Sequence, residues 1–291
     1  MHTDTPQTTQ TPPGNAGAQG NRPLLRMFVV LLIELIGFGI AIPVLPFLAK
    51  DFGASGLMVG LLFAAQAAGQ FVMAPLWGAL SDRLGRKPVL IATLLGAAGA
   101  SYLTALSGSL GWLFAARILA GMAAGNVSTA SAYITDVTDE DNRSKGMAVI
   151  GISFGLGFML GPAIGAFLAQ MGHALVFEVT AAISAVNAVV ALVVLHEPRR
   201  RRSRAEVRGT LRTMGALLQR PQTARVLSMT LVYAVSITLL ESMFAVYALE
   251  TFGYGPKQVG FILAGLAVVM VLVQGGGVAR VSKALGDRTM T

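Results

Sequence analysis

Long uninterrupted runs of apolar residues are the feature that most restricts the fold of this 291-residue chain. Several runs reach about eighteen residues or more, the length that a helix needs to cross the apolar interior of a bilayer. Only 12% of the residues are charged and 54% are hydrophobic, whereas a typical soluble domain has about 25% charged residues. A water-soluble fold of this composition would lack a polar surface, so the sequence predicts an all-α transmembrane protein.

The polar segments divide the chain into four parts. Residues 1–25, rich in Thr, Gln, Pro and Gly, are predicted to be a disordered tail, without the features of a signal peptide. Residues 26–195 hold six apolar runs, residues 196–225 form a basic linker, and residues 226–291 hold two further runs. The eight predicted spans are 26–48, 56–80, 88–107, 110–134, 146–169, 173–195, 226–249 and 257–280.

The net charge of +8 is a signal of membrane topology. All of the 22 lysines and arginines except Lys50, Lys257 and Arg117 lie in the tail or in every second loop. The positive-inside rule places those loops and both termini in the cytoplasm. The charge therefore indicates no nucleic-acid partner. The linker 196–225 is interpreted as a solvated connection that fixes topology, with docking to acidic lipid heads as the alternative.

Residues that carry enzyme chemistry are missing from the sequence. It contains no cysteine, and its histidines, His2, His173 and His196, are too scattered to form a metal site. No nucleophile arrangement or phosphate-binding loop is present. We therefore expect no catalytic residues, no metal and no cofactor.

The loop after the second span carries the most specific motif. It reads GALSDRLGRK over residues 78–87, where glycines permit a tight turn and Asp82 can pair with Arg86 or Lys87. The loop resembles the G-x-L-x-D-R-x-G-R-[KR] signature of the major facilitator superfamily. The resemblance implies a conformational latch between neighbouring helix ends. Its expected members are Gly78, Asp82, Arg83, Gly85, Arg86, Lys87, Asp136 and Arg143.

Two further motifs agree with this resemblance. Arg117 and Gly121 in the fourth span resemble the family's R-x-x-x-G helix motif, with Ala120 where glutamine is common. The fifth span resembles the family's antiporter motif G-x-x-x-G-P-x-x-G-G, with Ala166 as its last residue. Small residues four apart predict close helix contact, and a proline predicts a bend. The antiporter-motif residues are Gly157, Gly161, Pro162 and Gly165.

An internal repeat indicates how the eight spans are related. Residues 279–288 (ARVSKALGDR) are similar to residues 78–87, so spans seven and eight are interpreted as a second copy of spans one and two. The expected fold is a major facilitator fold with a complete N-terminal six-helix bundle and the first two helices of the C-terminal bundle. Four more spans would follow in the family, so a missing C-terminal segment is a possible partner.

Three charged residues lie inside predicted spans: Glu34, Arg117 and Glu241. An ion at the centre of a span costs about 2.5–3.5 kcal/mol and therefore usually faces a cavity or a partner. The first and seventh spans resemble those of twelve-helix tetracycline and quinolone exporters, which implies proton-coupling roles for Glu34 and Glu241. The resemblance to the fourth-helix motif implies such a role for Arg117. The alternatives are a structural pair for Glu34 and an interfacial position for Arg117. The residues predicted to line a substrate site, or else to pack in the core, are Gln66, Gln70, Phe154, Phe158, Phe244 and Tyr247.

The resemblance implies proton-coupled efflux of amphipathic drugs, such as tetracycline- or quinolone-type antibiotics, across a bacterial inner membrane. The partners would then be the drug, protons and the lipid bilayer, with the proton gradient as the energy source. Protonation of Glu241, together with Glu34, would release the drug. The alternatives are a truncated, transport-inactive fragment and an exporter of a sugar or another metabolite.

Overall fold

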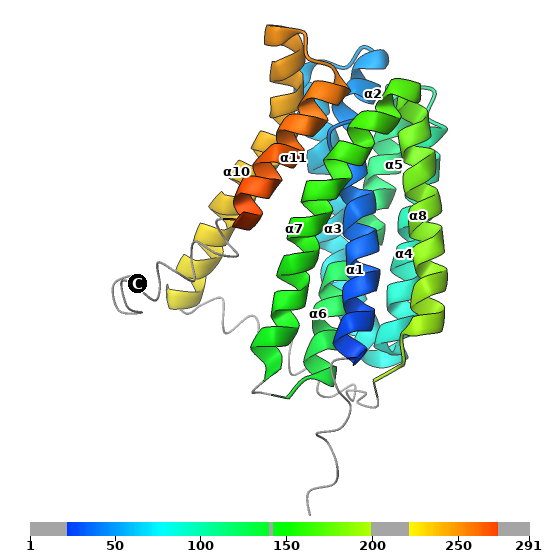
Figure 1. Ribbon diagram of the computed structural model, residues 1–291, viewed down its shortest axis with the longest axis vertical. Coiled ribbons are helices and arrows are strands. Elements are labelled where there is room, and N and C mark those ends of the chain that lie inside the picture. Colours follow the sequence, from blue (N-terminus) through cyan, green and yellow to red (C-terminus); the bar gives the residue numbers. More distant parts are fainter. Residues whose placement is uncertain (1–21, 140–141, 199–220, 273–291) are drawn as a thin grey trace, which may run out of the picture.

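The computed structural model describes residues 22–139, 142–198 and 221–272, which form helices joined by short turns (Figure 1). In these residues, seven helical segments are long and apolar enough to cross a membrane. These segments correspond to the first seven of the eight predicted spans. The eighth corresponds to α11 (Pro256–Leu272), which is shorter at 17 residues. Its predicted end at residue 280, like the repeat at 279–288, lies outside the described residues.

The helices otherwise follow the predicted spans, with shifted ends. Those of the first bundle are α1 (Arg22–Ala41), α2 (Leu45–Asp51), α3 (Gly56–Leu84), α4 (Arg86–Ala105), α5 (Leu110–Ala123), α6 (Asn126–Val137), α7 (Arg143–Leu168), the 3₁₀ turn η3 (Ala169–Met171) and α8 (His173–Val194). After the linker comes α10 (Pro221–Phe252), which begins at residue 221 rather than at the predicted 226.

The first predicted span is two helices, because α1 ends at Ala41 and α2 begins at Leu45. Pro43 lies between them and has no backbone N–H to donate, and Pro46 lies in the first turn of α2. Prolines at these positions end one helix and start the next.

The fourth predicted span is also two helices, α5 and α6, with a break at residues 124–125. A helix end in a membrane needs partners for its free carbonyl groups. Trp77 of α3 supplies one, because its Nε1 donates to the carbonyl oxygen of Met122 over 2.7 Å. The break is therefore supported by a neighbouring helix.

The antiporter-motif glycines of α7 face α1 at very short range. An added Cβ would lie 2.6 Å from Leu35 Cβ at Gly157 and 2.6 Å from Gly39 Cα at Gly161. At Gly165 the nearest atom would be the backbone oxygen of Ile40. Only glycine permits this approach of the two backbones, so the predicted close contact is present and its partner is α1.

A second side of α7 contacts α11. A Cβ added at Gly260 of α11 would lie 2.5 Å from Ala166 Cβ and 2.6 Å from the backbone oxygen of Pro162. The last motif position, which is alanine in this chain, therefore packs against α11. The helix α7 thus joins α1 to the segment after the linker.

The segment after the linker contacts the first bundle from the level of Gly155 and the cavity to the end that holds α2. There, Phe47 of α2 packs with Ala245, Ala248, Val259 and Leu263. Toward Pro221, α10 runs away from the first bundle (Figure 1). Its apolar side chains are exposed there, including Val226, Met229, Val232, Val235 and Leu239. The two parts therefore diverge toward the end that holds Arg86, Lys87 and Arg143, called the basic end below.

The Gly161 contact gives a direct test of this packing. We expect Gly161→Ala to lower the free energy of unfolding by about 1–3 kcal/mol, because the new methyl group meets backbone atoms that cannot rotate away. Unfolding of the detergent-solubilised protein by SDS titration measures the change. The matched control is Gly151→Ala, also on α7, where an added Cβ meets no atom within 4 Å. Equal stability of the two variants would contradict the assigned packing.

Candidate functional site

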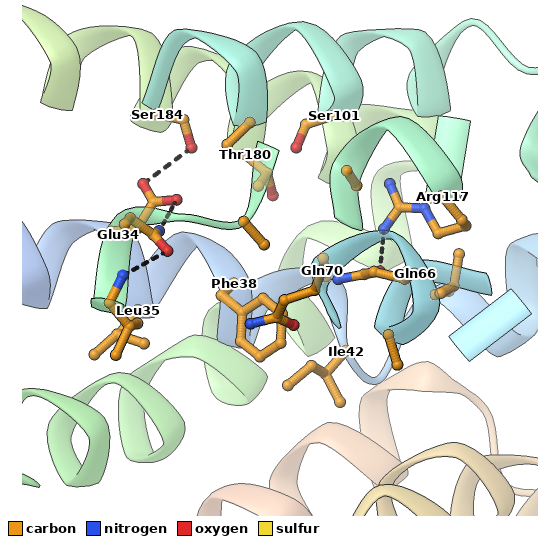
Figure 2. A pocket seen from close by; sticks show the side chains of 18 of the residues that line it. Glu34, Leu35, Phe38, Ile42, Gln66, Gln70, Ser101, Arg117, Thr180 and Ser184 are labelled. Carbon is orange, nitrogen blue, oxygen red and sulfur yellow. Dashed lines mark hydrogen bonds between the residues drawn. The ribbon is translucent and has the colours of Figure 1, made fainter. Parts of the chain in front are cut away.

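A cavity of about 270 Å³ lies among the helices of the first bundle (Figure 2). Helices α1 to α8 contribute its wall, and Thr238 of α10 also lines it. Among the side chains that the structure describes, two charged ones line the cavity, Glu34 of α1 and Arg117 of α5. The cavity therefore brings together two of the three intramembrane charges that the sequence singled out.

Glu34 is buried, with 7% of its surface exposed. Asn126 Nδ2 donates to its Oε1 over 2.9 Å, and its Oε2 accepts from Ser184 Oγ at 3.4 Å and Asn187 Nδ2 at 3.5 Å. These donors are uncharged, and Glu34 forms no ion pair within the described residues. A structural ion pair is therefore not what holds this carboxylate.

The break between α5 and α6 positions the closest of these donors. Asn126 is the first residue of α6. The preceding Gly125 is closely packed, because an added Cβ would lie 2.5 Å from the ring of Trp77 and 2.9 Å from Thr93. The same tryptophan that supports the end of α5 therefore fixes the turn that presents Asn126 to Glu34.

Arg117 is 5% exposed, so it is not the interfacial arginine considered from the sequence. Its Nη2 donates to Thr104 Oγ1, and its Nη1 donates to Gln66 Oε1 over 3.3 Å. The guanidinium lies 5.6 Å from the centre of the Phe177 ring. Its Nε has no partner within the described residues, and no carboxylate among them pairs with it.

Three of the six predicted substrate-site residues line the cavity: Gln66, Gln70 and Phe154. Phe158 is outside the lining but stacks on Phe154, with 6.1 Å between ring centres. The other two lie elsewhere. Phe244 packs against the apolar cluster around Phe47, and Tyr247 is 57% exposed and contacts Phe252. Neither of these two residues belongs to the cavity lining.

Glu241 lies on α10, whose backbone is described at this position. Its side chain lies outside the described part of the structure. Its predicted proton-coupling role therefore stays a prediction.

The predicted latch centres on Arg86, at the basic end. Arg86 Nη2 lies 2.5 Å from Asp82 Oδ1, its Nε lies 2.8 Å from Asp136 Oδ2, and its Nη1 donates to Ser81 Oγ over 2.6 Å. These bonds tie the adjoining ends of α3, α4 and α6 together. Arg83 and Arg143, which were also predicted to take part, have exposed side chains.

Sequence reasoning missed Glu197, which follows α8. Its carboxylate accepts from the backbone N–H of Arg86 over 2.7 Å and of Lys87 over 2.9 Å, at the start of α4. Gly85, with φ of +112°, leaves room, because an added Cβ would lie 2.5 Å from Glu197 Oε1. The one signal in the sequence is that an acidic residue follows directly after an apolar span. This pattern does not show which residues the acid contacts.

Comparison with known proteins places the fold. The sequence model of the Major Facilitator Superfamily matches residues 27–291. The chain is 31% identical over 276 residues to the class E tetracycline resistance protein of Escherichia coli, covering 92% of this chain and 68% of that protein. It is 26% identical over 258 residues to the quinolone resistance protein NorA of Staphylococcus aureus (strain MSSA476), covering 87% and 66%.

Solved structures give the same fold. The human organic anion transporter MFSD10 (TETRAN) superposes with a TM-score of 0.68 at 26% identity, covering 88% of this chain and 71% of that one. A bacterial homologue of the human lysosomal transporter Spinster gives 0.74 at 18% identity, covering 94% and 64%. The chain thus spans about two thirds of the length of the relatives it matches.

The Glu197 contact predicts a local effect on α4. We expect Glu197→Ala to speed hydrogen exchange of the Arg86 and Lys87 amides and to lower the free energy of unfolding by about 0.5–2 kcal/mol, as loss of a helix cap does. Mass spectrometry of exchanged peptides measures the first effect. Glu178→Ala, at an exposed glutamate of α8, is the control. Unchanged exchange at both amides in Glu197→Ala would refute the cap.

Proposed function

This chain belongs to the major facilitator superfamily of membrane transporters, and we propose that it acts in the proton-coupled export of amphipathic drugs. The observation that carries the proposal is Glu34, a buried carboxylate with neutral donors that lines a cavity inside the membrane. The drug class is supported by two relatives, whose names record resistance to quinolones and to tetracycline. The location proposed is the bacterial inner membrane, with the basic end in the cytoplasm.

Charge neutralisation at Glu34 would couple the drug to the proton. An ionised carboxylate in the membrane is costly unless a cation accompanies it. A cationic drug in the cavity or a proton on Glu34 can each remove this cost, so the two compete for the same group. Asn126, Ser184 and Asn187 hold the carboxylate in place through the exchange. Glu241 is proposed as a second coupling residue.

Alternating access would follow from the way in which α10 meets the first bundle. At the end opposite the basic end, Lys50 Nζ lies 2.6 Å from Glu250 Oε1, beside the Phe47 cluster. At the basic end the two parts diverge (Figure 1). We assign this arrangement to a state open to the cytoplasm. Opening to the other side would require the Lys50–Glu250 pair to separate while the Arg86 latch rearranges.

The first test concerns Glu34. We expect Glu34→Gln to weaken binding of tetraphenylphosphonium, a permanent lipophilic cation, by about tenfold or more, because a charged partner is lost. Binding to the wild type should weaken as the pH falls, because protons compete for the carboxylate, and this dependence should vanish in the variant. Equilibrium binding to purified protein over a pH series measures both. Glu178→Gln serves as the control. The proposal fails if Glu34→Gln keeps the affinity and pH dependence of the wild type.

The second test concerns the Lys50–Glu250 pair. The chain has no cysteine, so Thr238→Cys introduces a unique label site at the cavity. We expect Lys50→Gln in this background to raise labelling from outside cells by about two- to fivefold, since a partly exposed ion pair contributes roughly 0.2–1 kcal/mol. The double exchange Lys50→Glu with Glu250→Lys should restore the original rate. An unchanged labelling rate in Lys50→Gln would refute this contact as a gate.

A further inference from the structure

The cavity holds two buried side chains of opposite charge that do not pair with each other. In Figure 2, Glu34 and Arg117 lie at opposite ends of the cavity, with uncharged polar side chains between them. Neither forms an ion pair within the described residues. Both charges are therefore held by neutral groups, although each would be stabilised most by an ion of the opposite sign.

Arg117 has unused capacity for an anion. Its guanidinium carries five N–H donors in a planar fork that suits a carboxylate. Its partners among the described side chains are a threonine hydroxyl and, at 3.3 Å, the neutral Gln66 amide oxygen. Its Nε is buried without a partner among the described residues. An anionic oxygen that replaced Gln66 would form a shorter, charge-assisted bond.

The space between the charges suits a molecule with an apolar body. Phe38, Ile42 and Leu35 form one part of the wall, and Ser101, Thr180 and Gln70 supply polar groups (Figure 2). The volume of about 270 Å³ is close to the lower end of the range of about 300–1,000 Å³ found for small-molecule sites. The cavity is therefore close in size to a site for one small ligand, and both charged side chains belong to its lining.

From this arrangement we infer that the preferred substrates are zwitterions, with an anionic oxygen group bound at Arg117 and an ammonium group bound at Glu34. This inference rests on the proposed export function and narrows its substrate class. A molecule with both charges compensates both ends of the cavity. A simple cation leaves the Arg117 charge uncompensated, and a simple anion leaves that of Glu34.

Three related probes test the inference on purified full-length protein. Ciprofloxacin carries a carboxylate and an ammonium group, its methyl ester keeps only the ammonium, and its N-acetyl derivative keeps only the carboxylate. By titration calorimetry at neutral pH, we expect the wild type to bind ciprofloxacin about tenfold or more tightly than either derivative. Wild-type protein that binds the ester as tightly as the acid would overturn the inference.

Variants of Arg117 and Glu34 test which charged group of the ligand each residue binds. Arg117→Gln should make the acid and the ester bind equally while the preference for a free amine over its N-acetyl form remains. Glu34→Gln should make the free amine and its N-acetyl form bind equally, while the preference for the acid over the ester remains. Arg117→Lys keeps the positive charge but not the planar guanidinium, so it should keep part of the preference for the acid. This result would show that the loss in Arg117→Gln is not caused by misfolding. Arg225→Gln, at an exposed arginine of α10, should bind all three probes as the wild type does.

The outcomes separate the two proposals. If Arg117→Gln weakens the acid and the ester by the same factor while Glu34 still selects the free amine, the zwitterion inference is wrong and the export proposal stands. If the wild type selects neither the acid nor the free amine, Glu34 does not recognise cations and both fail.

Discussion

A charge inside a membrane is tolerated only where polar groups or an opposite charge surround it, and the first bundle is organised around this constraint. Glu34 accepts hydrogen bonds from side chains of α6 and α8. Arg117, on α5, donates hydrogen bonds to side chains of α3 and α4. The break in the fourth span belongs to the same arrangement, because it presents Asn126 to the carboxylate. Irregular backbone at membrane depth occurs where it lines a cavity.

Close packing connects this cavity to the rest of the molecule. Glu34 and Gly39 lie on the same helix, α1, and Gly39 meets the glycines of α7 at backbone contact. On another side, α7 meets Gly260 of α11. The charged cavity is therefore connected to α11 through α7, and Thr238 of α10 lines the cavity directly. An exchange of charge at Glu34 can act on that contact without a long chain of intermediates.

The features that could be predicted from the sequence are those that local pattern determines. Apolar runs located the helices, and glycines four apart predicted the close face of α7. The Asp82–Arg86 contact could be predicted because the two residues share one short loop. By contrast, Glu197 meets the start of α4 across about a hundred residues of sequence, and Asn187 reaches Glu34 from the sixth span. Such contacts depend on how helices pack, which residue spacing does not encode. The same limit applies to Phe244 and Tyr247, which share the helix of Glu241 but do not line the cavity.

The central claim is that a proton and a cation neutralise the same buried carboxylate. Titration calorimetry of wild-type protein with tetraphenylphosphonium, repeated in buffers of different ionisation enthalpy, counts the protons released on binding. We expect that binding of each cation releases a proton when Glu34 is protonated beforehand, and that no proton is released where it is already ionised. Binding that releases no proton at any pH would contradict it.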